Sequence, residues 1–113
     1  MKAAKFDYTR PQDVRAAIHA LADAKGEGKF LAGGQSLGPM LNLRLTRPKL
    51  LVDVSRIESL RSIAVANGSI RIGAAVTHAE IEDAGALLAR NAMLPAVARE
   101  IASRPIRNRG TLG

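Results

Sequence analysis

Two glycine-containing segments carry the residue types best suited to bind an anion. The first is Ala32-Gly33-Gly34-Gln35-Ser36-Leu37, which follows a short apolar run and precedes a helical pattern. Glycines let a ligand approach the main chain, and amides at the start of a helix favour an anion such as a diphosphate. Taken alone, the motif also fits a tight turn that needs a positive φ. It is neither G-x-G-x-x-G nor a P-loop, which argues against a Rossmann or NTPase site.

The second segment is Arg107-Asn108-Arg109-Gly110-Thr111-Leu112-Gly113. Its two arginines, the Thr111 hydroxyl and the backbone amides could grip phosphate oxygens. An isolated Arg-Asn-Arg-Gly is more often an exposed basic turn, so that interpretation is favoured for this segment by itself.

No set of side chains predicts an acid–base site or a metal site. His19 is expected on the surface, and His78 is expected to support the first turn of a helix. His78 and Glu80 are two residues apart and therefore do not share a helical face. For Asp53, at the end of a strand, the favoured role is a structural hydrogen bond. We therefore expect no catalytic residue and no metal ligand in this chain.

The composition indicates a globular chain with an aliphatic core. Of 113 residues, 47% are hydrophobic and only 3% aromatic, which argues against base stacking on single-stranded nucleic acid. With no cysteine, the chain cannot itself hold an iron–sulfur cluster or a thiolate zinc site. It shows neither a signal-peptide pattern nor a run of roughly 18 apolar residues. We therefore expect a cytoplasmic protein with no membrane span.

The first half of the chain predicts a β-α-β-α-β unit with parallel strands. Strands are expected at residues 6–8, 29–32 and 50–54, the second of them buried. A first helix is expected after a Thr9 cap, and its apolar stripe faces the sheet. The stripe consists of Val14, Ala17, Ile18, Leu21 and Ala22.

A second helix is expected over residues 36–45, with Pro39 in its first turn. The second half of the chain predicts a hairpin over residues 63–73 around Asn67-Gly68. Thr77 and Glu80 form a capping box for a helix that runs to about Asn91, and Leu94-Pro95 opens another. Pro105 is expected to break the helical pattern.

Four segments occur in a fixed order along the chain, and together they resemble one family. They are Ala32-Gly33-Gly34-Gln35-Ser36-Leu37, Met40-Leu41-Asn42-Leu43-Arg44-Leu45, Thr77-His78-Ala79-Glu80, and Ile106-Arg107-Asn108-Arg109-Gly110-Thr111-Leu112-Gly113. In this order they resemble the FAD-binding (medium) subunit of the molybdenum hydroxylases, the group with the carbon monoxide dehydrogenase and xanthine dehydrogenase type enzymes.

The resemblance implies an α/β (α+β) fold of the PCMH or vanillyl-alcohol-oxidase type, in which two subdomains clasp FAD. Residues 1–55 would form the first subdomain, and residues 56–113 the N-terminal part of a truncated second one. The implied cofactor-binding residues fall into three groups. They are Lys29, Leu31, Ala32, Gly33, Gly34, Gln35, Ser36 and Leu37 around the diphosphate loop; Ile101 and Ala102 near the isoalloxazine ring; and Thr111 and Gly113 in the family's second clamp.

The resemblance also implies a function in electron transfer. Electrons would pass from the clusters of an iron–sulfur small subunit through FAD to an external acceptor, while a molybdopterin-binding large subunit oxidises the substrate. The chain would thus be an oxidoreductase subunit in a hetero-oligomer that binds no nucleic acid. Family subunits are considerably longer, so we expect a fragment or truncated reading frame that is inactive alone and retains little FAD.

Two alternatives remain open. The net charge of +7 and the arginines at residues 104–109 would suit a basic nucleic-acid-binding module, although the charge is scattered. The chain could also be an inactive truncated remnant that keeps the fold without a ligand.

Overall fold

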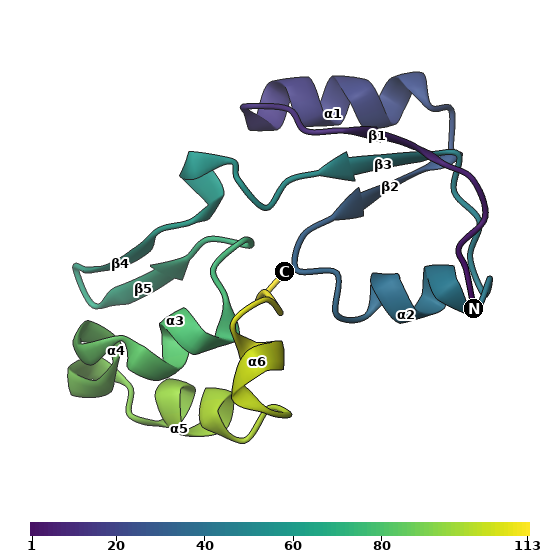
Figure 1. Ribbon diagram of the computed structural model, residues 1–113. Coiled ribbons are helices and arrows are strands. Elements are labelled where there is room, and N and C mark those ends of the chain that lie inside the picture. Colours follow the sequence, from purple (N-terminus) through teal and green to yellow (C-terminus); the bar gives the residue numbers. More distant parts are fainter.

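The computed structural model describes residues 1–113 and arranges them in two groups of elements (Figure 1). The first group contains β1 (Asp7–Thr9), α1 (Val14–Asp23), β2 (Gly28–Leu31), α2 (Leu37–Asn42) and β3 (Leu50–Asp53). Its strands pair in parallel in the order β1-β3-β2. The predicted β-α-β-α-β unit is therefore confirmed.

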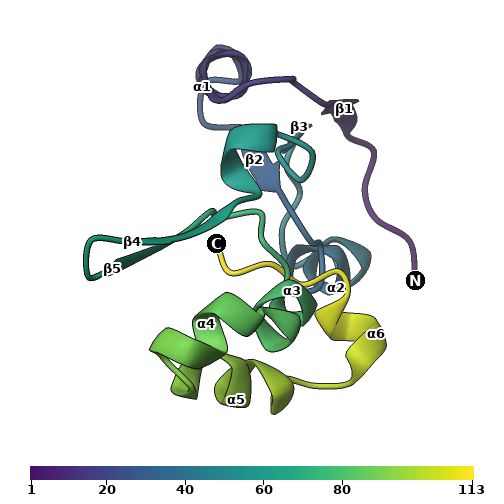
Figure 2. The same ribbon diagram turned by 90° about the vertical axis from the view of Figure 1, so that its left-hand side faces the viewer.

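The central strand β3 is apolar on both faces because α1 and α2 lie on opposite sides of the sheet (Figure 2). Leu51 and Val52 are accordingly buried. Strand β2 has a neighbour on one side only. Lys29 and Phe30 on β2 are exposed, so the prediction that this strand is buried was wrong.

Helix α1 begins one residue after Asp13, whose carboxylate accepts a 2.7 Å hydrogen bond from the amide of Ala16. The prediction that Thr9 caps this helix was wrong, because Thr9 is the last residue of β1 and pairs with Val52. The predicted apolar stripe was correct in part. Ala17 is buried against the sheet, but Val14 and Ile18 are 38% and 56% exposed.

Helix α2 ends at Asn42, three residues before the predicted end. Arg44 adopts a left-handed conformation, with φ of 56°. The Leu45 amide donates to the Met40 carbonyl and the Arg44 amide to the Leu41 carbonyl, the pattern of a Schellman motif. This local termination leaves Leu43 and Leu45 exposed. Pro39 stands in the first turn, as predicted.

The second group begins with η1 (Glu58–Leu60) and the antiparallel hairpin of β4 (Ile63–Ala66) and β5 (Ser69–Ile72). Both turn residues, Asn67 and Gly68, have positive φ, which confirms the predicted Asn-Gly hairpin. Four short helices follow: α3 (His78–Asp83), α4 (Gly85–Arg90), α5 (Met93–Arg99) and α6 (Arg104–Arg107).

Two of these helices differ from the prediction. The capping box is present, with Thr77 Oγ1 accepting from the Glu80 amide and Glu80 Oε2 accepting from the Thr77 amide. The helix nevertheless ends at Asp83, because Ala84 is extended, and α4 restarts the helical path. Pro105 does not break the pattern but stands in the first turn of α6, where its missing N–H costs little.

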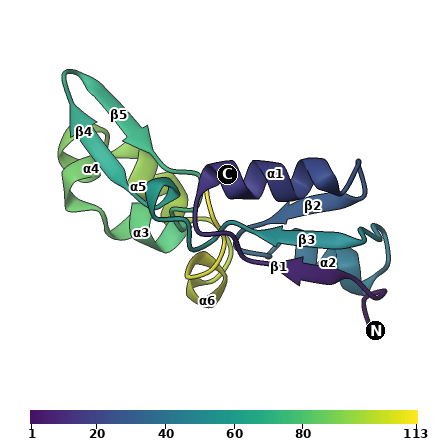
Figure 3. The ribbon, with the colours of Figure 1, turned by 90° about the horizontal axis from the view of Figure 1, so that it is seen from above.

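Each group has its own hydrophobic core, and Figure 3 shows the groups side by side. Ala17, Val52 and Ile57 form one core, and Val76, Ile81, Leu87 and Ala98 form the other. The radius of gyration is 15.6 Å, above the roughly 13 Å of a compact domain of this length. The two groups therefore form an elongated molecule rather than one compact body. None of the helices has the length and apolar character needed to cross a membrane.

Candidate functional site

A cleft of about 860 Å³ lies between the two groups and is lined by both. Its volume falls within the roughly 300–1,000 Å³ of small-molecule and cofactor sites. The lining from the first group includes Val14, Ala17, Ile18, Phe30, Ala32, Gly33, Gly34, Gln35, Ser36 and Leu37. The lining from the second group includes Ala74, His78, Ile101, Ala102, Ile106, Gly110, Thr111 and Gly113.

The main chain between β2 and α2 offers a row of unused hydrogen-bond donors to this cleft. No amide of residues 32–37 donates to a protein acceptor, and the first backbone bond of the turn joins the Gly38 amide to the Gly34 carbonyl at 2.8 Å. Successive backbone N–H groups in such a turn form a concave site for an anion. The loop therefore has the chemistry of a phosphate or diphosphate site.

Gly33 and Gly34 are glycines for different reasons. A Cβ on Gly33 would lie 2.0 Å from the carbonyl oxygen of Arg109 and 2.9 Å from the Cα of Gly110. Gly34 has more space but takes a φ of +74°, which L side chains disfavour. The main chain that approaches Gly33 thus belongs to the second glycine-containing segment.

That second segment is held in place by backbone hydrogen bonds to the start of α3 and to the residues before it. The His78 amide donates to the Gly110 carbonyl, and the Leu112 amide donates to the Val76 carbonyl, both at 2.9 Å. These bonds pair Thr111 with Thr77 in an antiparallel bridge. The Thr111 amide donates to no protein group, so the cleft has a free donor on this side as well.

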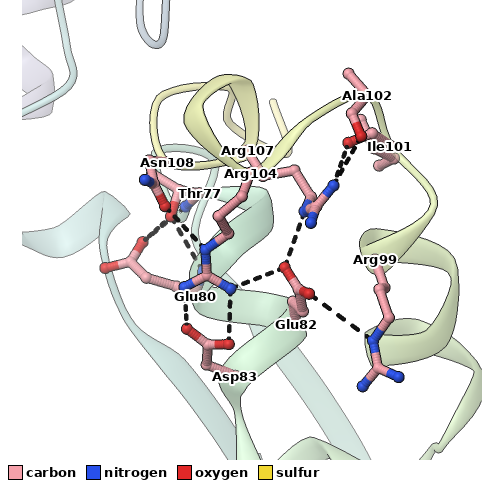
Figure 4. Close-up of polar contacts among 10 residues, drawn as sticks. All are labelled: Thr77, Glu80, Glu82, Asp83, Arg99, Ile101, Ala102, Arg104, Arg107 and Asn108. Carbon is pink, nitrogen blue, oxygen red and sulfur yellow. Dashed lines mark hydrogen bonds and ion pairs between the residues drawn. The ribbon is translucent and has the colours of Figure 1, made fainter.

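The structure does not support a phosphate grip by the two arginines of this segment. Arg107 is only 9% exposed. It is bound to Glu82 and to the carbonyls of Ile101 and Ala102 through Nε and Nη1, and it does not line the cleft (Figure 4). Arg109 is exposed and does not line the cleft. The basic-turn interpretation was also wrong for Arg107, because a buried carboxylate neutralises it.

The predicted cofactor-binding residues line the cleft, with two exceptions. Lys29 and Leu31, both on β2, lie outside the lining. Lys29 is exposed on the edge strand, and Leu31 reaches under the loop toward Gly34. The remaining predicted residues are brought together from three separate stretches of the chain, at residues 32–37, 101–102 and 111–113.

Sequence reasoning missed several lining residues. Val14, Ile18 and Phe30 are exposed apolar side chains that form one wall of the cleft. The sequence did indicate Val14 and Ile18, because the apolar stripe of α1 is wider than a small sheet can cover. His78 also lines the cleft, and its ring lies 3.1 Å from the position of a Cβ on Gly110.

The cleft offers apolar contacts and main-chain donors to a ligand. Its lining contains no carboxylate, lysine or arginine, and His78 is its only titratable side chain. Apolar walls beside free amides can hold a planar ring system and a negatively charged linker at the same time.

Asp53 lies outside the cleft and has the structural role that was predicted. It accepts hydrogen bonds from the Tyr8 hydroxyl and, at 2.9 Å, from the Ser55 amide. Burial opposes ionisation of Asp53, but the hydrogen bonds from Ser55 and Tyr8 together lower its pKa. The same hydrogen bond to Asp53 raises the pKa of Tyr8.

The chain is similar to known proteins over its whole length. The family model described as the FAD binding domain in molybdopterin dehydrogenase matches residues 4–113. The alpha subunit of the 6-hydroxypseudooxynicotine dehydrogenase complex of Paenarthrobacter nicotinovorans is 42% identical over 113 residues, which are 100% of this chain and 38% of that protein. The xanthine dehydrogenase FAD-binding subunit of Escherichia coli O157:H7 is 35% identical over 94% of this chain and 36% of its own length.

A solved structure shows the same likeness in three dimensions. Carbon monoxide dehydrogenase from Hydrogenophaga pseudoflava, in a form that lacks the Mo-pyranopterin moiety of its molybdenum cofactor, matches with a TM-score of 0.96 at 36% identity. The match covers 98% of this chain and 39% of that one, and it confirms the predicted fold class. The chain spans well under half the length of the relatives it matches.

Proposed function

The chain belongs to the family of FAD-binding domains in molybdopterin dehydrogenases, and on that premise we propose that it holds FAD in the cleft as part of an electron-transfer subunit. Membership confirms the resemblance seen in the four sequence segments, and FAD is the cofactor that the family description names. The observation that carries the proposed site is the row of free amides at residues 32–37, because all of these residues line a cleft of cofactor size.

The residues present fit the parts of FAD. The amides of residues 32–37 and of Thr111 would hold the diphosphate, with Gly33 and Gly34 leaving room for it. Ile101, Ala102 and the exposed apolar side chains of α1 and β2 would hold the ring systems and exclude water from them. In this assignment the chain binds and orients the cofactor and contributes no acid or base.

The proposed activity is that of one subunit in a molybdopterin-dependent oxidoreductase. When bound, the flavin would supply the redox chemistry that links iron–sulfur clusters of a small subunit to an external acceptor. A molybdopterin-binding large subunit would oxidise the substrate, so substrate choice would reside there. We also propose that the protein is cytoplasmic and that it divides into two subdomains, at residues 1–55 and 56–113. Ile57 and Leu60 pack on the first core and would form the seam between them.

A titration of the isotope-labelled chain with FAD tests the proposed site, because amide shifts report weak binding residue by residue. We expect the largest changes at residues 32–37 and at Thr111. Riboflavin is the control ligand, since it has the isoalloxazine ring but lacks the diphosphate and the adenosine. It should bind more weakly and leave the amides of residues 32–37 unshifted. Equal affinity for both ligands, or FAD shifts confined to other residues, would contradict the proposal.

A further inference from the structure

The buried Arg107 has no part in the proposed diphosphate contacts, yet it binds the carbonyls of two residues that line the cleft. Its guanidinium donates from Nε to Glu82 Oε2 at 2.9 Å and from Nη1 to the carbonyls of Ile101 and Ala102 at 3.0 and 2.8 Å (Figure 4). Arg107 thus joins the end of α3 to the turn that follows α5. Both carbonyls belong to residues that line the cleft.

The turn that Arg107 holds has a strained main chain. Ala102 has a φ of +47°, a left-handed conformation that is costly for any residue with a Cβ. Such a conformation persists only when its surroundings determine it. No backbone amide donates to the Ile101 or Ala102 carbonyl, so the guanidinium is the partner of both. The two hydrogen bonds from Arg107 Nη1 therefore favour the main-chain conformation in which the Ile101 and Ala102 carbonyls both point toward the guanidinium.

Glu82 keeps the guanidinium in place. Its side chain is as well buried as that of Arg107, and its Oε2 accepts from both Arg104 and Arg107 at 2.9 Å. A planar guanidinium can bind a carboxylate and two carbonyls at once, whereas a lysine ammonium cannot reproduce that fork.

From these contacts we propose that Arg107, anchored by Glu82, is a positioning residue that sets the Ile101–Ala102 wall of the cleft and thereby the fit of the bound cofactor. The identity of that cofactor rests on the proposed function. The position of the wall does not, since it follows from the contacts of Arg107 alone.

The chain offers a matched pair of variants. Arg107→Lys keeps the charge and can pair with Glu82, but it cannot also hold both carbonyls. Arg104→Gln alters the same cluster, because Arg104 binds Glu82 and Asp83, but Arg104 contacts no carbonyl of the cleft wall. Thermal unfolding identifies the folded variants. Glu82→Gln is a second route if Arg107→Lys does not fold, because it removes the charge and leaves an oxygen to accept from Arg107.

Two readouts decide the matter. The backbone chemical shifts of Ala102, which report its dihedral angles, should move toward right-handed or extended values in Arg107→Lys and stay unchanged in Arg104→Gln. The FAD dissociation constant should rise about tenfold in Arg107→Lys, less in Glu82→Gln, and under twofold in Arg104→Gln. The proposal is overturned if folded Arg107→Lys keeps the Ala102 shifts and the FAD affinity of the unmodified chain, or if Arg104→Gln weakens FAD binding equally. If the unmodified chain binds no FAD, the proposed function fails, and the Ala102 shifts still decide whether Arg107 sets the wall.

Discussion

Replacing Gly33 with alanine should separate the two glycine-containing segments that meet at the cleft. The new Cβ would lie 2.0 Å from the Arg109 carbonyl oxygen, so residues 109–110 would have to retreat by about 1.4 Å to reach an ordinary 3.4 Å contact. The bond from the His78 amide to the Gly110 carbonyl is 2.9 Å, and a shift of that size would break it. Overpacking and one lost hydrogen bond together cost about 2–4 kcal/mol.

Gly85 provides the matched control for this substitution. Apart from its chain neighbours and the backbone of its own helix, a Cβ at Gly85 meets no atom within 4 Å, and the residue begins α4. Gly85→Ala should therefore leave the melting temperature unchanged or raise it slightly, because Ala favours a helix more than Gly does. Gly33→Ala should lower the melting temperature by about 10 °C and weaken FAD binding in the amide titration. A Gly33→Ala chain that melts with the parent and keeps the His78 and Gly110 resonances would refute this account of the close approach.

Three further predictions test other contacts. Tyr8→Phe should cost under about 1 kcal/mol because the pair with Asp53 is partly solvated. Because the pKa of Asp53 is lowered and that of Tyr8 is raised in the folded chain, the loss should be complete between about pH 4 and pH 10 and should fade below and above that window, so urea unfolding should show the two chains converging at both ends. Thr77→Ala should lose about 1 kcal/mol in urea unfolding as the capping box opens, and Thr77→Ser should retain most of it. FAD affinity should change less than threefold between about 50 and 200 mM salt, whereas a nucleic-acid complex with six to ten phosphate contacts would weaken by about 10³-fold or more.

Local patterns predicted the elements that local chemistry determines. The apolar run at residues 50–54, the Asn67-Gly68 turn and the Thr77–Glu80 capping box each carry their cause within a few residues, and all three are present. The end of α2 was predicted three residues too late, because the residue that ends the helix is not one that usually does so. Arg44, rather than a glycine, takes the left-handed position after α2, and a sequence pattern does not favour arginine there.

Contacts between distant segments were beyond the reach of sequence spacing. Gly33 was weighed as a turn residue or a ligand contact, but its main determinant is the carbonyl of Arg109. Arg107 was weighed as a phosphate ligand or an exposed turn residue, but it lies buried against Glu82. The exposed half of the α1 stripe shows the same limit, because apolar spacing shows which residues avoid water and not what covers them.

The placement of charge explains why composition and geometry favoured different functions. A net charge of +7 is the feature that suggested nucleic acid, yet no lysine or arginine lines the cleft. Its anion-binding capacity comes from main-chain amides, which carry no formal charge and do not contribute to the isoelectric point. Counting arginines therefore reports on the outer surface of this chain, while the site is determined by two glycine-containing segments that leave their amides unpaired. The net charge is evidence about partners that dock on the surface, and the unpaired amides are evidence about the cofactor.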